Sequence, residues 1–115
     1  MTDLIPLLAS ACTLALGTLW LIAPEKVAKY LGVTPQGKLG ISEVRATYGG
    51  IFVGLGVAAL WFQQPEVYAA VGFGWLSSGW VRTVSVFLDQ SFDVRNLGGI
   101  VIELGIGLAL VSEML

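Results

Sequence analysis

Four apolar segments, each about as long as a membrane-spanning helix, follow one another along the chain with short polar stretches between them. They cover roughly residues 4–23, 41–62, 67–88 and 97–115. A helix needs about 20 apolar residues to cross the hydrocarbon core of a bilayer, so four spans use about 80 positions and leave room only for connections. We therefore predict an all-α fold, a single domain over residues 1–115 that forms an integral membrane four-helix bundle.

The connection between the first and second segments predicts a short additional helix. Val27, Tyr30 and Leu31 recur there at the spacing of one helical face, and lysines lie between them. A short helix that is apolar on one side and basic on the other is typical of the membrane interface. We expect this amphipathic helix to start at Pro24 and to end before Gly32.

Basic residues in the connections predict the orientation in the membrane. They occur in two of the three connections, as Lys26, Lys29 and Lys38 in the first and Arg95 in the third. Because basic loops tend to remain in the cytoplasm, both connections are predicted to be cytoplasmic. An even number of spans then puts both termini on the outer side.

Composition excludes several kinds of site. The chain has no histidine and a single cysteine, Cys12, so we expect no zinc, copper or haem site and no disulfide within the chain. With 12% charged residues and a net charge of −2, it has no basic footprint for nucleic acid. We expect neither a cofactor nor a bound metal, and only an oxygen-ligated Mg²⁺ or Ca²⁺ site stays open.

Five ionisable side chains fall inside the apolar segments or at their edges. Such residues cost roughly 2.5–3.5 kcal/mol each near a helix centre, and they usually face a bundle interior, pair with one another and mark a functional site. At a rise of about 1.5 Å per residue, Arg45 lies about 6 Å from the cytoplasmic end of its span, and Arg82 and Glu103 lie about 9 Å from theirs. The sequence predicts a polar layer in the cytoplasmic third, formed by Glu43, Arg45, Arg82, Asp89 and Glu103.

Small and neutral polar residues accompany these charges. Tyr48 shares a helical face with Arg45, and Ser85 follows Arg82 by one helical turn, so both hydroxyls are candidate partners in the layer. A stripe at three- and four-residue steps in the third segment runs through Gly74, Ser78, Arg82, Ser85 and Asp89. Close approach of neighbouring helices is expected at Gly49, Gly50, Gly54, Gly99 and Gly107.

The tryptophans are expected on the outside of the bundle. Trp20 and Trp61 lie near the ends of their segments and are predicted to belong to the aromatic belt at the membrane interface. For Trp75 and Trp80 we expect contact with lipid or with a partner subunit. Lining a hydrophobic ligand pocket is the alternative for these two.

Two interpretations of the polar layer stay open. In the first, ion pairs only fix the register of the helices, Arg82 with Glu103 and Arg45 with Glu43 or Asp89. In the second, the two arginines bind an anionic headgroup or a carboxylate, assisted by the hydroxyls of Tyr48 and Ser85.

The segment Ser42–Gly50, with the sequence SEVRATYGG, resembles a family of small bacterial membrane proteins, the domain of unknown function 4345 family. The stretches APEKVAKYLGV and PQGKLG, an arginine late in the third segment and a glutamate in the fourth extend the resemblance over most of the chain. It implies a four-span protein of the bacterial inner (cell) membrane and no particular reaction. The positions that match the family pattern are Glu43, Arg45, Tyr48, Gly49, Gly50, Arg82 and Glu103.

Two hypotheses of function follow. The first is a small integral membrane accessory or interaction protein that packs with itself, as a homo-oligomer, or with a larger membrane protein complex, and binds a membrane lipid or lipophilic anion at the polar layer. The alternative is a membrane enzyme for acid–base isomerisation, cyclisation or epoxide opening of a lipophilic substrate. In that case Glu43 or Glu103 is the acid or base and Tyr48 an auxiliary donor. Transport ranks last, because four spans without broken midplane helices offer little for alternating access.

Overall fold

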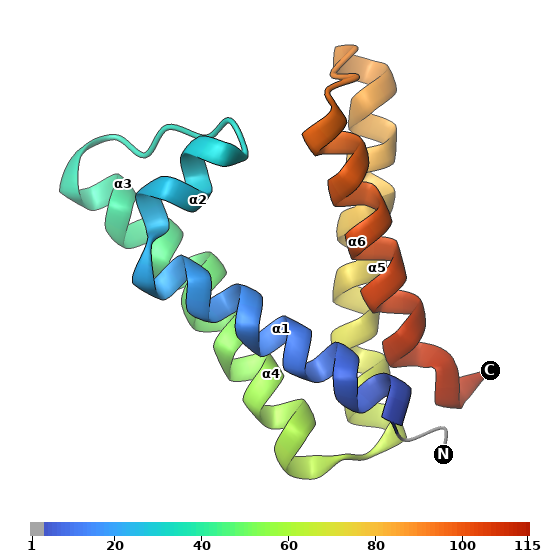
Figure 1. The fold of residues 1–115 in the computed structure, drawn as a ribbon. Coiled ribbons are helices and arrows are strands. Elements are labelled where there is room, and N and C mark those ends of the chain that lie inside the picture. Colours follow the sequence, from blue (N-terminus) through green and yellow to red (C-terminus); the bar gives the residue numbers. More distant parts are fainter. Residues whose placement is uncertain (1–3) are drawn as a thin grey trace.

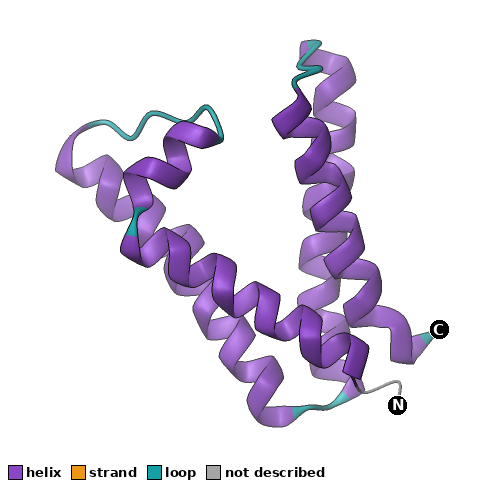
Figure 2. Cartoon of the chain, viewed as in Figure 1, coloured by secondary structure: helices purple, strands orange, loops and turns teal. Residues whose placement is uncertain are grey.

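The computed structural model describes residues 4–115, and nearly all of them are helical (Figure 2). Because α3, η1 and α4 follow one another without interruption, the described residues form five separate helical stretches and no strand, which confirms the predicted all-α fold. The elements are α1 (Leu4–Ile22), α2 (Pro24–Tyr30), α3 (Gly37–Val44), the π-helical segment η1 (Arg45–Gly50), α4 (Ile51–Phe62), α5 (Pro65–Asp89), α6 (Val94–Val111) and a final 3-10 turn η2 (Ser112–Met114).

Three of these stretches are long and apolar enough to cross a membrane. They are Leu4–Ile22, Gly37–Phe62 and Val94–Met114, which coincide with the first, second and fourth apolar segments of the sequence. The third apolar segment corresponds to α5, whose 25 residues are long enough to span but include three charged side chains, Glu66, Arg82 and Asp89. The prediction of membrane-span-like helices is therefore confirmed for three of the four segments.

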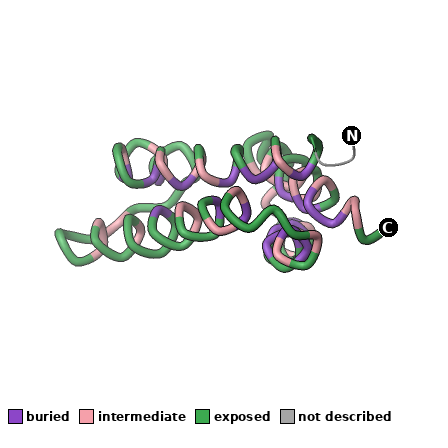
Figure 3. Tube along the Cα trace, turned by 90° about the horizontal axis from the view of Figure 1, so that it is seen from below, coloured by how far each residue is buried: buried purple, intermediate pink, exposed green. Residues whose placement is uncertain are grey.

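The helices form two pairs that meet at one end and diverge toward the other (Figure 1). We call α1, η1 and α4 the N-terminal arm, and α5 and α6 the C-terminal arm. The arms meet near the Gln63–Gln64 turn and separate toward the end that carries α2 and the α5–α6 loop. The molecule measures 43 × 31 × 16 Å, and its buried positions are confined to the sides of helices that face one another (Figure 3).

This open shape differs from the compact bundle that we expected. Toward the diverging end, the side chains that α5 presents include Ser77, Ser78 and Arg82, so no continuous apolar surface is available to draw the arms together there. The main buried apolar cluster of the described residues lies in the half where the arms meet and consists of Ala9, Ala59, Tyr68, Val71, Trp75 and Leu110.

Glycines bring the two helices of each arm into close contact. In the N-terminal arm, a Cβ atom on Gly56 would lie 2.7 Å from the backbone nitrogen of Leu14. In the C-terminal arm, a Cβ on Gly107 would lie 2.9 Å from the backbone nitrogen of Leu76. Both distances are shorter than side chains tolerate, so each arm is held at a separation that only glycine permits.

The glycines singled out from the sequence fall into two groups. Gly49 lies against Leu21, as Gly107 lies against Leu76, whereas Gly50 and Gly54 face open space. The two groups differ in the direction they face around the helix. Gly49 and Gly56 lie on the side that contacts α1. Gly50 is one residue after Gly49, about 100° further around a helix, and so faces away from α1.

Two of the tryptophans are buried rather than peripheral, which corrects the sequence-based expectation. Trp20 is 6% exposed and its ring lies 4.8 Å from that of Tyr48, between centroids. Trp75 is 7% exposed, and its indole Nε1 donates a 2.9 Å hydrogen bond to Thr13 Oγ1, which joins the two arms. A buried indole needs such a partner for its N–H, and Thr13 supplies one from α1. Trp61 and Trp80 are exposed.

The connection after α1 forms the predicted short helix, α2. Its end is fixed by Gly32, whose φ of +80° belongs to the left-handed region that favours glycine. The amide of Gly32 donates to the carbonyl of Lys29, and that of Val33 donates to the carbonyl of Ala28, at 3.1 and 2.8 Å. This pair of bonds is the Schellman arrangement, so α2 ends in a defined geometry at Gly32, as predicted.

Candidate functional site

The centre of the candidate site is an ion pair between the two helices of the C-terminal arm. Arg82 of α5 donates from Nε to Oε1 of Glu103 at 2.6 Å and from Nη2 to Oε2 at 3.0 Å. The guanidinium and the carboxylate therefore meet in the two-pronged geometry that gives the strongest hydrogen bonds between these groups. Glu103 of α6 is 8% exposed, whereas about a third of the Arg82 side chain is exposed.

Neutral side chains extend this pair into a network. Ser78 donates to Oε2 of Glu103 at 2.6 Å, and Arg82 donates from Nη1 to Oδ1 of Asn96 at 3.0 Å. Asn96 in turn donates to both the carbonyl and the hydroxyl of Ser91, at 3.0 and 2.9 Å. The network thus runs continuously from α5 across α6 to the loop that joins them. We call these five residues the α5–α6 network.

Helical spacing explains why these residues meet. Ser78 and Arg82 are four positions apart on α5, and Asn96 and Glu103 are seven apart on α6, so each pair lies on one face of its helix. Gly99 leaves room between them, because a Cβ there would lie 3.2 Å from the Nε of Arg82. The guanidinium of Arg82 therefore packs directly against the backbone of Gly99.

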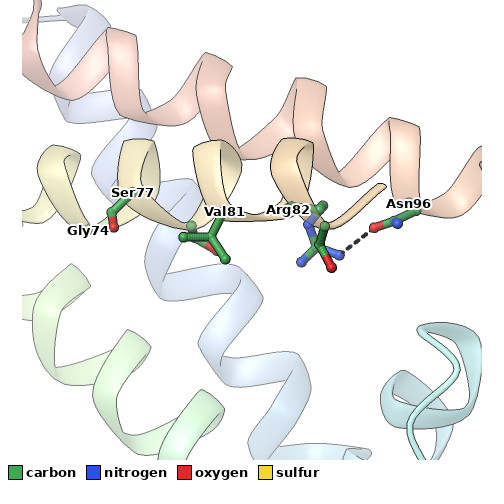
Figure 4. Close-up of a pocket in the computed structure, with 7 residues that line it drawn as sticks. Gly74, Ser77, Val81, Arg82 and Asn96 are labelled. Carbon is green, nitrogen blue, oxygen red and sulfur yellow. Dashed lines mark hydrogen bonds between the residues drawn. The ribbon is translucent and has the colours of Figure 1, made fainter. Parts of the chain in front are cut away.

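A surface depression of about 500 Å³ opens beside the network. In the close-up of Figure 4, the labelled side chains of α5 and Asn96 of α6 project to the same side of the C-terminal arm. The depression is lined by Gly74, Ser77, Ser78, Val81, Arg82, Ser85 and Asn96. A smaller one of about 220 Å³ shares Arg82 and Asn96 with it and continues toward the end of α2, with Leu31, Ser91, Asp93 and Arg95 as its other lining residues.

Tyr48, another predicted site residue, lies in the N-terminal arm. It is 40% exposed, and its ring is tilted by 34° against that of Trp20. Tyr48 belongs to η1, a π-helical segment within the continuous stretch from Gly37 to Phe62. Such segments are rare and are frequent at functional sites. This segment carries RATYGG, the larger part of the motif singled out in the sequence.

Three other predicted site residues lie outside the network. Arg45 donates from Nε to the carbonyl of Leu21 at 3.3 Å, and so caps one of the last carbonyls of α1, which lack amide partners at a helix end. Asp89 accepts a 2.9 Å hydrogen bond from Ser85, one turn earlier on α5. Glu43 is exposed on α3 and has no ion pair among residues 4–115.

Arg95 closes the far side of the smaller depression. It donates from Nη1 to the carbonyl of Tyr30 at 2.8 Å, and its guanidinium lies 5.9 Å from the centre of the Tyr30 ring. Asp93 accepts hydrogen bonds from the side chain and the backbone amide of Arg95, and these bonds lower the pKa of Asp93 to about 2. The first turn of α6 is thereby joined to α2 at the diverging end of the arms.

Asn96, Ser91 and Ser77 were not among the site residues predicted from the sequence. A signal for Asn96 was present, because it precedes Glu103 by seven residues and so shares its helical face. No comparable pattern pointed to Ser91, which lies in the loop, or to Ser77, which lines the depression beside the predicted stripe.

The arrangement suits hydrogen bonding better than the binding of a strong anion. The carboxylate of Glu103 already neutralises Arg82, and three of the five N–H donors of this guanidinium are used within the network. The groups that remain toward the depression are the hydroxyl of Ser77, the oxygens of Ser85 and Asn96 as acceptors, and the remaining donors of Arg82. They can bind a group that both donates and accepts hydrogen bonds.

Comparison with known proteins identifies the family. The family model described as Domain of unknown function (DUF4345) matches residues 1–112, which is almost the whole chain. No curated protein and no solved structure matches the chain. The chain that carries the SEVRATYGG motif and the α5–α6 network therefore belongs to the DUF4345 family.

Proposed function

We propose that this protein is an integral membrane accessory protein whose C-terminal arm binds the polar group of a membrane amphiphile in the depression beside the α5–α6 network. In this proposal α5 crosses the membrane as a fourth span in the bacterial inner membrane. The end that carries α2 and Arg95 faces the cytoplasm, because it bears the basic loops. The polar network then lies within the cytoplasmic third of the bilayer.

The observation that carries the proposal is an open, polar depression of about 500 Å³ on a helix of membrane-spanning length. Its volume is in the range of sites for small ligands, about 300–1,000 Å³. Hydroxyl and amide groups at this depth need hydrogen-bonding partners, since lipid tails provide none. Ser77 would donate to and accept from an amphiphile that enters from the side, and Oδ1 of Asn96 would accept from it.

Charge balance favours a neutral or zwitterionic polar group. Arg82 and Glu103 cancel one another's charge, so a strongly anionic ligand would have to compete with a carboxylate that is already bound at 2.6 Å. A headgroup with hydroxyl or amide functions meets no such competition. The lipophilic part of the ligand would lie between the diverging arms.

The test is native mass spectrometry of protein extracted from its own membranes in a mild detergent. We expect the wild-type protein to retain about one amphiphile per chain, and Ser77→Leu to reduce this retention about tenfold or more, because the larger side chain fills the depression. Ser77 has no hydrogen bond to the network, so the ion pair should remain intact in this variant. Equal retention in the wild type and in Ser77→Leu would contradict the proposal.

The matched control is Val84→Leu. Val84 is on α5 and partly exposed but does not line the depression, so this variant adds apolar bulk to the same helix without blocking the site. We expect Val84→Leu to retain the amphiphile as the wild type does. Loss of retention in both variants would indicate a general effect on α5.

The enzyme alternative has less support from the geometry. Both carboxylate oxygens of Glu103 accept hydrogen bonds from Arg82, and Oε2 also accepts one from Ser78. A general base must instead reach a proton of the substrate. These contacts favour a role for Glu103 in holding Arg82 and shaping the depression.

A further inference from the structure

The six cations of the chain divide into arginines that are bonded within the fold and lysines that are not. Arg82 and Arg95 form ion pairs with carboxylates, and Arg45 caps a backbone carbonyl. The three lysines are exposed, and none lies within 4.0 Å of a carboxylate among residues 4–115. They are Lys26 and Lys29 on α2 and Lys38 at the start of α3, and we call them the lysine shelf.

The shelf is held in place by backbone contacts at both ends of α2. Arg45 from η1 donates to the carbonyl of Leu21 just before α2, and Arg95 from the other arm donates to the carbonyl of Tyr30 at its last residue. The Schellman bonds at Gly32 fix the direction in which the chain leaves. The lysines therefore project from an ordered support, although their own side chains are unconstrained.

The shelf also has a definite inner and outer side. Pro24 and Ala28, four positions apart, are buried against the rest of the chain, and Lys26 and Lys29 lie on the exposed side of the same helix. Exposed apolar side chains flank the lysines, namely Tyr30, Leu31, Val33 and Leu39. Basic side chains next to exposed apolar ones are typical of a segment that lies in the interface of an anionic membrane leaflet.

We propose that the lysine shelf binds the headgroups of anionic phospholipids in the leaflet that faces it. Each ammonium group is a compact, mobile charge that can pair with a phosphate without an internal competitor. Lysines close to a negatively charged leaflet are attracted to it, and the attraction falls off within about a Debye length, which is about 10 Å at 0.1 M salt. The segment from Pro24 to Gly40 carries three lysines and one glutamate, a local charge of +2 (3 − 1), in a chain of net charge −2.

This surface is separate from the depression beside the α5–α6 network. No lysine lines that depression, and the groups there are neutral or internally paired. The shelf therefore selects lipids by headgroup charge, whereas the depression selects by hydrogen bonding. Binding of anionic lipid at the shelf does not depend on binding of an amphiphile in the depression.

The experiment uses the full chain reconstituted into vesicles of phosphatidylcholine with about 20% phosphatidylglycerol. Native mass spectrometry of protein released from these vesicles counts the lipids of each class that remain bound. We expect the wild type to retain phosphatidylglycerol over phosphatidylcholine about tenfold beyond their ratio in the vesicle, and this preference to fall several-fold at about 0.5 M salt.

The decisive variant replaces the three lysines together, K26Q/K29Q/K38Q, which keeps long polar side chains and removes the charge. We expect its preference for phosphatidylglycerol to fall to about that of the bulk lipid mixture. The matched control K26R/K29R/K38R should keep the preference, since it keeps the charge. An undiminished preference in the glutamine variant would overturn the proposal, as would no preference in the wild type.

Two further measurements separate this outcome from others. Circular dichroism of the glutamine variant should match that of the wild type, because the lysine side chains form no ion pair among residues 4–115. The Ser77→Leu variant should keep the phosphatidylglycerol preference, since Ser77 is not part of the shelf. If Ser77→Leu abolished the preference, the anionic lipid would be bound at the depression and the shelf proposal would fail.

Discussion

The two arms use the same packing device but differ in what lies at their interfaces. In both, glycine allows the helices to approach until backbone and side chain touch, at Gly56 against Leu14 and at Gly107 against Leu76. In the N-terminal arm, aromatic rings also pack between the helices, among them those of Trp20 and Tyr48. The C-terminal arm instead carries a hydrogen-bonded ion pair between its helices.

The N-terminal arm serves mainly to stabilise the fold, whereas the C-terminal arm also carries the candidate binding site. Glycine contacts and ring contacts supply stability without ion pairs, so the N-terminal arm needs no ion pair between its helices. An ion pair contributes little net stability when its desolvation is counted, yet it becomes costly to break once formed. We infer that the C-terminal arm retains its polar network for the depression beside it.

The largest expected effect comes from breaking the ion pair on one side. Glu103→Leu leaves Arg82 without its carboxylate, and we expect it to lower the free energy of unfolding by about 3 kcal/mol, as for other buried pairs that lose one partner. The double variant R82M/E103L should recover most of this loss, because it removes the unpaired charge as well. Chemical unfolding in detergent, followed by circular dichroism, measures both.

Glu43→Gln is the control for that prediction. Glu43 is exposed and has no ion pair among the described residues. The free energy of unfolding of the Glu43→Gln variant should therefore differ from that of the wild type by less than about 0.5 kcal/mol. A double variant as unstable as Glu103→Leu alone would mean that volume, and not charge, determines stability at this position.

A somewhat smaller effect should follow from adding a methyl group at the glycine contacts, and it should be alike in both arms. Gly56→Ala and Gly107→Ala each force a carbon to within 3 Å of backbone atoms, which we expect to cost about 2 kcal/mol. Gly54→Ala and Gly105→Ala have open space around them and should be neutral or stabilising by up to about 1 kcal/mol. A cost in one arm only would show that the arms do not share the device.

The contact between the arms can be tested through Trp75 and Thr13. We expect Trp75→Phe and Thr13→Val each to lower the free energy of unfolding by about 1 kcal/mol beyond their changes in volume, through loss of the 2.9 Å hydrogen bond. The double variant should cost less than the sum of the single ones, since they share one bond. Strict additivity in this cycle would argue against the bond.

The smallest effect concerns Asp93 in the α5–α6 loop of the C-terminal arm. The pKa of Asp93 is lowered to about 2 by its bonds with Arg95, so the folded state favours the ionised carboxylate. The resulting stability is complete above the ordinary pKa of 3.8 and is lost as the pH falls through about 2. The chemical shift of the Asp93 carboxyl carbon, followed by NMR, should therefore still report an ionised group at about pH 3. A titration midpoint near the ordinary value would contradict the bonded arrangement.

The helices could be predicted from the sequence because their signals are local. Long apolar segments and the prolines and glycines that bound them are sufficient for the all-α fold, and the Gly32 end of α2 follows from the same reasoning. The helical rise, counted from the ends of the apolar segments, also predicted a common depth for Arg82 and Glu103, and the bridge between them was one of the two interpretations. Their partner Asn96 could have been found from its spacing to Glu103.

The angle between the arms and the π-helical segment could not be predicted. The angle depends on where the apolar core ends, which is a property of four helices at once. The segment Arg45–Gly50 has no signature that distinguishes it from α-helix in a single sequence. The role of Arg45 was missed for a related reason. Its partner is the backbone carbonyl of Leu21, and since every residue has such a carbonyl, the sequence does not indicate which one is bound.

A molecule only 16 Å thick has no interior that is remote from its surroundings. Every helix has one side in contact with the surroundings of the protein, and the depression on α5 opens on that side. In the bilayer that we propose, a ligand would reach it by diffusion in two dimensions, without leaving the leaflet. Occupancy would then depend on the mole fraction of the amphiphile among the lipids rather than on its solubility in water, so titrations should vary the lipid composition at constant protein-to-lipid ratio.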